Sequence, residues 1–204
     1  MSANSCIIFD NGGDTLKFGY ATSSHPRCIN NCIALIKNQP RRYVGDEIDS
    51  LRNKSGLIIN RTLEKGIITN WQTNMDVWER AFDILNINIS SKSATTGTAN
   101  KHFEDKTFVL TSAPFAPESV QNDMNEIVFE ELGFSSFISR PASWFSAYEF
   151  SNVDTEHNSM SRKFPDCNLV IDSGFSFTHA IPLINMKTNV KSVRRQVLSA
   201  VTNH

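Results

Sequence analysis

A repeated segment places the strongest constraint on how this chain can fold. Residues 7–20 run Ile-Ile-Phe-Asp-Asn-Gly-Gly-Asp-Thr-Leu-Lys-Phe-Gly-Tyr, and residues 169–179 run Leu-Val-Ile-Asp-Ser-Gly-Phe-Ser-Phe-Thr-His. Each begins with an apolar run typical of a buried strand and continues through residues that favour a tight turn. Each ends with alternating apolar and polar residues, the period of a half-buried strand. The sequence therefore predicts two similar β-hairpins, in two lobes whose hairpin tips face a shared cleft.

The first predicted turn carries residue types that suit a phosphate ligand. Main-chain N–H groups of such a turn can bind an anion, Lys17 can neutralise it, and Asp10 can bind a cation or its waters. Asn-Gly turns also occur where nothing binds. These residues by themselves leave both interpretations open.

The two hairpins resemble the phosphate loops of the actin family, with Asp10-Asn11-Gly12 as the first loop and Asp172-Ser173-Gly174 as the second. Residues 43–47, Tyr-Val-Gly-Asp-Glu, match the family's pattern, and residues 64–71 depart from it only slightly. Residues 110–114, Leu-Thr-Ser-Ala-Pro, are similar to a strand end that precedes a long helix in actin. These matches follow one another in the family's order along nearly the whole chain.

The resemblance implies the α/β fold of actin-like ATPases and a division into lobes. Residues 1–150 are expected to form the first lobe, with residues from about 30 to 63 as its small outer subdomain. Polar residues 151–166 are expected to form a loop or a hinge-side insertion, and residues 167–204 an incomplete start of the second lobe. Because actin-family chains continue well beyond this length, we expect the sequence to be a fragment, a truncated gene model or a short isoform.

Helical signals lie between these motifs. A stripe of apolar residues at helical spacing predicts an amphipathic helix over 71–85, and Pro117 and Gly133 are typical first and last residues of a second helix. Pro141 is expected to begin a short third helix. Strands are expected over 108–110, 169–171 and 175–184, and the Ser- and Thr-rich residues 90–101 are expected to form a loop.

Composition excludes several classes of function. The chain has 204 residues, 40% of them hydrophobic, and a formal net charge of -1, so no overall basic charge favours nucleic acid. No apolar run approaches the length that spans a membrane. Because the N-terminus also lacks a basic region followed by a long apolar one, we expect an intracellular chain. The four cysteines lack zinc-finger spacing, so we expect reduced thiols and no metal site; they are Cys6, Cys28, Cys32 and Cys167.

Part of the family's nucleotide site is present in the sequence. Five residues match positions that surround the metal and phosphates in actins, which makes ATP with magnesium the ligand implied by the resemblance: Asp10, Gly12, Lys17, Asp172 and Gly174. Four residues depart from the actin pattern: Asp14, Pro141, Phe175 and Ser176. We therefore expect no catalytic residue and a degenerate site.

Each departure has a physical consequence. A carboxylate at Asp14 faces phosphate anions, and two unit charges at about 4 Å cost roughly 4 kcal/mol at an effective dielectric near 20. Phe175 and Ser176 replace an acidic residue and a glycine on the metal side. Pro141 replaces the glutamine that positions the attacking water, and proline has no polar side-chain group.

The departures resemble one class within the family, the actin-related protein 6 class, through residues 175–179, 112–114 and 202–204. That resemblance implies a nuclear scaffold subunit of a chromatin-remodelling complex that exchanges a variant histone into nucleosomes. The implied partners are the remodeller ATPase subunit and a small zinc-finger subunit, with the nucleosome contacted indirectly. The alternative is an actin-like protein that binds ATP, hydrolyses it slowly and serves the cytoskeleton. A distant sugar kinase is a third hypothesis, against which the motifs at 43–47 and 64–71 argue.

Overall fold

The computed structural model describes residues 5–87, 103–149, 152–153, 162–163 and 166–197. The chain divides into two compact units, Met1–Ser139 and Arg140–His204. Helix α3 (Ala142–Glu149) packs against β13 (Cys167–Ser173) of the second unit, so it belongs there although the sequence places it before the expected lobe boundary at 150. Each unit is described by itself.

The first unit is built on a five-stranded sheet with strand order β10-β9-β1-β2-β3. Strands β1 and β2 form the first predicted hairpin, pairing antiparallel with Asp10 opposite Lys17. Strand β9 runs parallel to β1 on its other side. The strands are β1 (Cys6–Asn11), β2 (Thr15–Tyr20), β3 (Arg27–Asn30), β9 (Thr107–Ser112) and β10 (Ser136–Pro141).

The helices of the first unit lie close to where the sequence places them. Helix α1 (Trp71–Ile84) begins after Asn70, whose side chain accepts a hydrogen bond from the Thr73 N–H at 3.0 Å. Helix α2 (Glu118–Glu126) begins directly after Pro117, and Gly133 has a φ of 77° after the helix ends. The sequence pattern does not show that residues Ile127–Glu131 continue α2 as a π-helical turn, η2.

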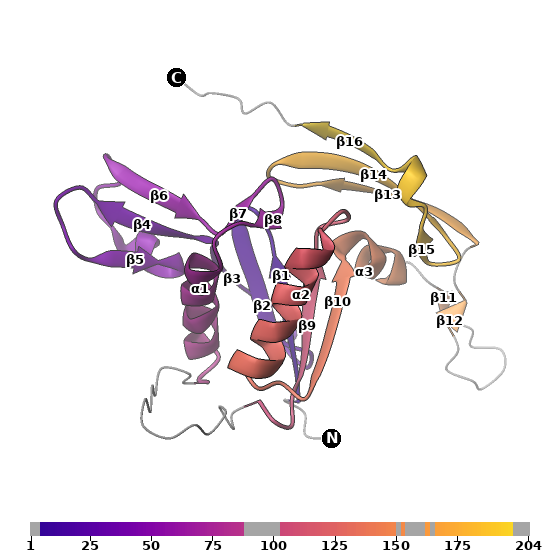
Figure 1. Ribbon diagram of the computed structural model, residues 1–204, viewed down its shortest axis with the longest axis horizontal. Helices are drawn as coiled ribbons and strands as arrows, with labels where there is room; N and C mark the ends of the chain where they lie inside the picture. The colour runs from indigo at the N-terminus through magenta and orange to yellow at the C-terminus, as the bar shows by residue number, and fades with distance from the viewer. Residues whose placement is uncertain (1–4, 88–102, 150–151, 154–161, 164–165, 198–204) are drawn as a thin grey trace. The chain divides into compact units, whose positions relative to one another are not determined.

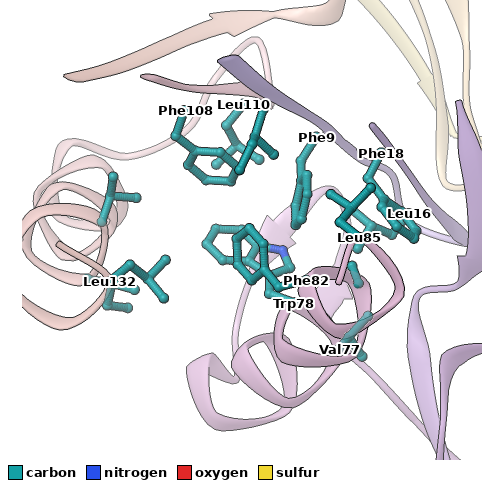
Figure 2. Close-up of a cluster of buried hydrophobic side chains, with 14 of the residues drawn as sticks. Phe9, Leu16, Phe18, Val77, Trp78, Phe82, Leu85, Phe108, Leu110 and Leu132 are labelled. Carbon is teal, nitrogen blue, oxygen red and sulfur yellow. The ribbon is translucent and has the colours of Figure 1, made fainter. Parts of the chain in front are cut away.

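Strand alternation places one face of the sheet against these helices. Ile7 and Phe9 of β1 are both fully buried, whereas Ile8 between them is 39% exposed. Figure 2 shows Phe9 facing Trp78 and Phe82 of α1 in the core of this unit. The Phe9 ring stacks on Phe82 at a centroid distance of 4.9 Å and meets Phe108 edge-on at 5.1 Å. The aromatic stripe of the 71–85 segment is therefore core, as the sequence predicts.

A small outer sheet is appended to the first unit, in strand order β5-β4-β6. Its strands are β4 (Cys32–Ile36), β5 (Arg42–Val44) and β6 (Leu57–Arg61), and a 3-10 helix, η1 (Gly45–Ser50), follows β5. Two short strands, β7 (Leu63–Glu64) and β8 (Ile67–Ile68), then lead to α1, as Figure 1 shows. The outer sheet and η1 fall in the segment of about 30–63 that the sequence assigns to an outer subdomain, whereas β8 lies beyond it.

The actin-like motif at 43–47 attaches this outer sheet to α1. Gly45 has a φ of 57°, and a Cβ atom there would lie 2.9 Å from Ile29 Cδ1, so the position favours glycine. Asp46 accepts two hydrogen bonds of 2.8 Å from the Arg80 guanidinium of α1. These bonds lower the pKa of the Asp46 carboxyl from its ordinary value.

The second unit contains the second predicted hairpin. Strand β13 pairs antiparallel with β14 (Phe177–Ile184), with Asp172 opposite His179. Strands β15 (Lys187–Thr188) and β16 (Arg194–Val197) both pair with β14, and a 3-10 helix, η3 (Val190–Ser192), lies between them. The expected strand start at residue 175 is wrong by two residues, because the Gly174 N–H donates to the Phe177 carbonyl at 2.9 Å and closes the turn there.

Three further expectations concern segments that the structure describes only in part or not at all. The 90–101 loop and residues 202–204 lie outside the described residues. Of the 151–166 segment, the structure describes Asp166 and the short antiparallel pair β11 (Asn152–Val153) and β12 (Arg162–Lys163). Among the helices that are described, none has the length and apolar character needed to cross a membrane.

Candidate functional site

Strand alternation sends Asp10 and Asn11 to opposite faces of the central sheet. Asp10 accepts hydrogen bonds from Lys17 Nζ at 3.2 Å and from Thr111 Oγ1 of β9 at 2.8 Å. Asn11 lies on the helix side, where its Nδ2 donates to Asn74 Oδ1 of α1 at 3.2 Å. The end of β1 is thus held to its hairpin partner, to the parallel strand β9 and to α1.

Gly12 follows at the tip of the hairpin, where the backbone turns tightly. Its N–H donates to the Asp10 carbonyl at 3.1 Å. A Cβ atom at this position would lie 2.8 Å from the Thr15 carbonyl oxygen, a main-chain atom that cannot move without disturbing β2. The glycine predicted to belong to a phosphate loop is therefore also required by the turn itself.

Asn31 holds the tip of the first loop from the outer-sheet side. It is fully buried and is the single residue between β3 and β4. Its Nδ2 donates to Asn11 Oδ1 at 2.8 Å and to the Gly12 carbonyl at 2.7 Å, and its N–H donates to the Asp14 carbonyl at 2.8 Å. Asn31 is not predicted from the sequence, because an isolated Asn between two strands has no distinguishing pattern.

Asp14 lies in an ion pair. Its Oδ1 accepts a hydrogen bond from Arg61 Nη1 of β6 at 3.0 Å, and the same guanidinium atom lies 3.3 Å from the Gly13 carbonyl oxygen. From the sequence, Asp14 is expected to be an uncompensated negative charge facing phosphate. The structure corrects this expectation, because the Arg61 guanidinium lies beside the Asp14 carboxylate. Sequence reasoning missed Arg61, which reaches Asp14 only through the register of the outer sheet.

The four charges around the first loop therefore balance one another. Lys17 pairs with Asp10, and Arg61 pairs with Asp14. A polyphosphate carries several negative charges and would meet two carboxylates whose nearby cations already have anionic partners. Asp10, Gly12 and Lys17 are brought together as the sequence predicts, and Asp14 adds a second carboxylate to the loop at a position that departs from the actin pattern.

The second loop brings Asp172 and Gly174 together in the second unit. Ser173 Oγ and Thr178 Oγ1 lie 3.1 Å apart across the hairpin, and Phe175 in the turn is 54% exposed. His179 lies opposite Asp172, and partial burial lowers its pKa, with Asp172 acting in the opposite direction. Pro141 is the last residue of β10 and directly precedes α3, in agreement with its predicted role at a helix start.

A small hollow lies beside the first loop within the first unit. Asn11, Thr111 and Ser112 are its polar lining residues, and its other walls include Ile68 and Met124. Its cavity volume of about 20 Å³ has space for one water molecule. In the part of the chain that the structure describes, no group of three or more His, Cys, Asp and Glu side chains could hold a metal ion.

Comparison with known proteins agrees with the hairpin geometry. The family model described as Actin matches residues 1–201. The chain belongs to the actin family. The predicted family and the actin-like α/β fold are thereby confirmed.

Several curated relatives of this actin-family chain carry the same name. This chain is 29% identical to Actin-related protein 6 of Drosophila melanogaster over 194 residues, which are 95% of this chain and 45% of the relative. It is 32% identical to Actin-related protein 6 of Arabidopsis thaliana over 210 residues, 97% of this chain and 45% of the relative. It is 30% identical to Actin-related protein 6 of Neurospora crassa over 194 residues, which are 93% of this chain and 41% of the relative. The chain thus spans less than half the length of these relatives.

Proposed function

We propose that this actin-family chain serves as a scaffold subunit of a nuclear chromatin-remodelling complex that exchanges a variant histone into nucleosomes. Its partners in this proposal are the remodeller ATPase subunit and a small zinc-finger subunit, and it contacts the nucleosome indirectly. The proposal places the protein in the nucleus. Its support from comparison is the likeness to proteins named Actin-related protein 6.

The observation that carries the proposal is the internal pairing of the first-loop charges. Asp10 with Lys17 and Asp14 with Arg61 leave this loop with no surplus positive charge from these four residues. An actin-like hairpin is thus retained while its charge balance is unsuited to a polyphosphate. This combination fits a protein whose fold is used for assembly rather than for nucleotide turnover.

Affinity purification from nuclear extract tests the proposed assembly. We expect the tagged chain to recover a remodeller ATPase and a small zinc-finger protein, identified by mass spectrometry. The same purification with tagged actin, and a second one from cytosolic extract, are the controls. Recovery of cytoskeletal proteins without a remodeller ATPase would contradict the proposal and favour the cytoskeletal alternative.

We also propose that the protein hydrolyses no ATP at a useful rate. Phosphoryl transfer to water needs a positioned nucleophile and a metal-bound triphosphate. Pro141 has no polar side-chain group that could position the nucleophile. Asp14 adds a negative charge and Phe175 replaces an acidic residue on the metal side, so both oppose binding of a metal-bound triphosphate. A phosphate-release assay with ATP and magnesium should give a rate indistinguishable from the buffer blank, for this chain and for a longer form that continues the fold. Actin-like turnover by the longer form would overturn the scaffold proposal.

A further inference from the structure

Arg61 connects the outer sheet of the first unit to the first loop. It is the last residue of β6, and Thr62, the next residue, is fully buried where the chain returns from the outer sheet. Its Nη1 reaches Asp14 Oδ1 at 3.0 Å and the Gly13 carbonyl oxygen at 3.3 Å. One guanidinium group therefore contacts both a side chain and the main chain of the loop.

These contacts close a ring between the loop and both chain crossings. The chain enters the outer sheet through Asn31, whose N–H donates to the Asp14 carbonyl at 2.8 Å. It leaves through Thr62, whose Oγ1 donates to the Asn31 carbonyl at 3.3 Å. Arg61 adjoins Thr62 in sequence and pairs with Asp14. The ring thus runs from Asp14 through Arg61, Thr62 and Asn31 back to Asp14.

We propose that Asp14 is a built-in anion of the first loop, and that its pairing with Arg61 braces the β6 end of the outer sheet against that loop. A guanidinium group such as that of Arg61 binds carboxylate and phosphate anions alike, so an anionic ligand could supply this negative charge from outside. Here the chain supplies it from a residue of the turn itself. The inference rests on the proposed function, in which the first loop has a structural role.

The Asp14–Arg61 brace is expected to stabilise only the β6 side of the outer sheet. Asp46 with Arg80 and Arg42 with Asp76 attach the opposite side of the outer sheet to α1 independently of the loop. Loss of the Asp14–Arg61 pair is therefore expected to loosen β6 and to leave β5 protected. The side chains of Arg61 and Asp14 are 36% and 53% exposed, so their pair is of the weak, solvent-screened kind.

Hydrogen exchange of the full 204-residue chain tests the brace. Asp14→Asn and Arg61→Gln should each speed exchange of the amides of 57–61 by about 2- to 5-fold, the range expected for an exposed ion pair. The amides of 42–44 should be unchanged. Lys54→Gln is the matched control, because it removes the exposed Lys54–Asp49 pair, which joins η1 to the loop before β6. The charge exchange Asp14→Arg with Arg61→Asp should restore protection.

Binding of inorganic pyrophosphate tests the built-in anion. Asp14→Asn removes a negative charge while Arg61 stays beside Gly13, so pyrophosphate should bind about 10-fold more tightly than to the unmodified chain. Arg61→Gln leaves the carboxylate and removes the cation, so pyrophosphate should bind more weakly. Isothermal titration at low ionic strength measures both. Asp14→Asn is nearly isosteric, Arg61→Gln shortens the side chain as it removes the charge, and the two are expected to act with opposite signs.

Two results would overturn the proposal, each by itself. One is exchange of 57–61 in Asp14→Asn and Arg61→Gln that equals exchange in Lys54→Gln. The other is pyrophosphate binding to Asp14→Asn no tighter than to the unmodified chain. If Asp14→Asn fails to fold, Arg61→Gln decides alone, through faster exchange and weaker binding. Neither measurement involves protein partners, so hydrogen exchange and pyrophosphate binding still test the brace if the purification from nuclear extract fails.

Discussion

Replacement of Phe9 by alanine is expected to lower the free energy of unfolding of the first unit by about 3–5 kcal/mol. Phe9 is fully buried and contacts four other aromatic rings, Phe18, Trp78, Phe82 and Phe108, at centroid distances of 5.6, 6.0, 4.9 and 5.1 Å. Truncation leaves a cavity whose walls belong to three elements, β2, α1 and β9. Rings held on separate elements cannot all move inward to fill it.

Urea unfolding followed by tryptophan fluorescence measures this loss, because Trp71 and Trp78 both lie in α1 of the first unit. Ile8→Ala is the matched control. Ile8 is the next residue of the same strand and is 39% exposed, so its truncation should cost about 1 kcal/mol or less. Equal losses for the two variants would show that Phe9 is not at the centre of the core.

Asn31→Ala is the second substitution with a large expected effect, about 2–4 kcal/mol of unfolding free energy. The change removes the Nδ2 donor from Asn11 Oδ1 and from the Gly12 carbonyl. A buried acceptor left without its donor costs about 1–3 kcal/mol. Because both acceptors belong to the first loop, the effect should reach beyond the outer sheet, whose strand β4 begins directly after Asn31.

Asn60→Ala provides the comparison for this prediction. Asn60 is an asparagine of β6 in the same outer sheet and is exposed, so its replacement should change stability by no more than about 0.5 kcal/mol. Thermal unfolding by circular dichroism of the two variants, side by side, decides the matter. If the thermal unfolding curve of Asn31→Ala overlays that of Asn60→Ala, Asn31 does not stabilise the first loop.

Local sequence patterns were sufficient to predict several elements of this fold. The turn residues between two apolar runs predicted the hairpin of β1 and β2, and the apolar stripe beginning at Trp71 predicted α1. Pro117 and Gly133 predicted where the next helix begins and ends. Each depends on neighbours within a few positions along the chain, which is why periodicity and capping residues reveal it.

What holds the first loop was decided only by the tertiary structure. Asp14 and Arg61 are 47 positions apart, and Asn31 is 20 positions from Asn11. The Asp14–Arg61 pair forms because the antiparallel register of β4 and β6 places Cys32 opposite Arg61 at the edge that meets the loop. Asn31 reaches Asn11 because it follows β3, whose register with β2 places Asn30 opposite Thr15. A register shift of one residue would turn Arg61 to the other face of its strand. The sequence by itself therefore determined the hairpin and its charged residues, whereas long-range strand pairing determined which charges neutralise one another.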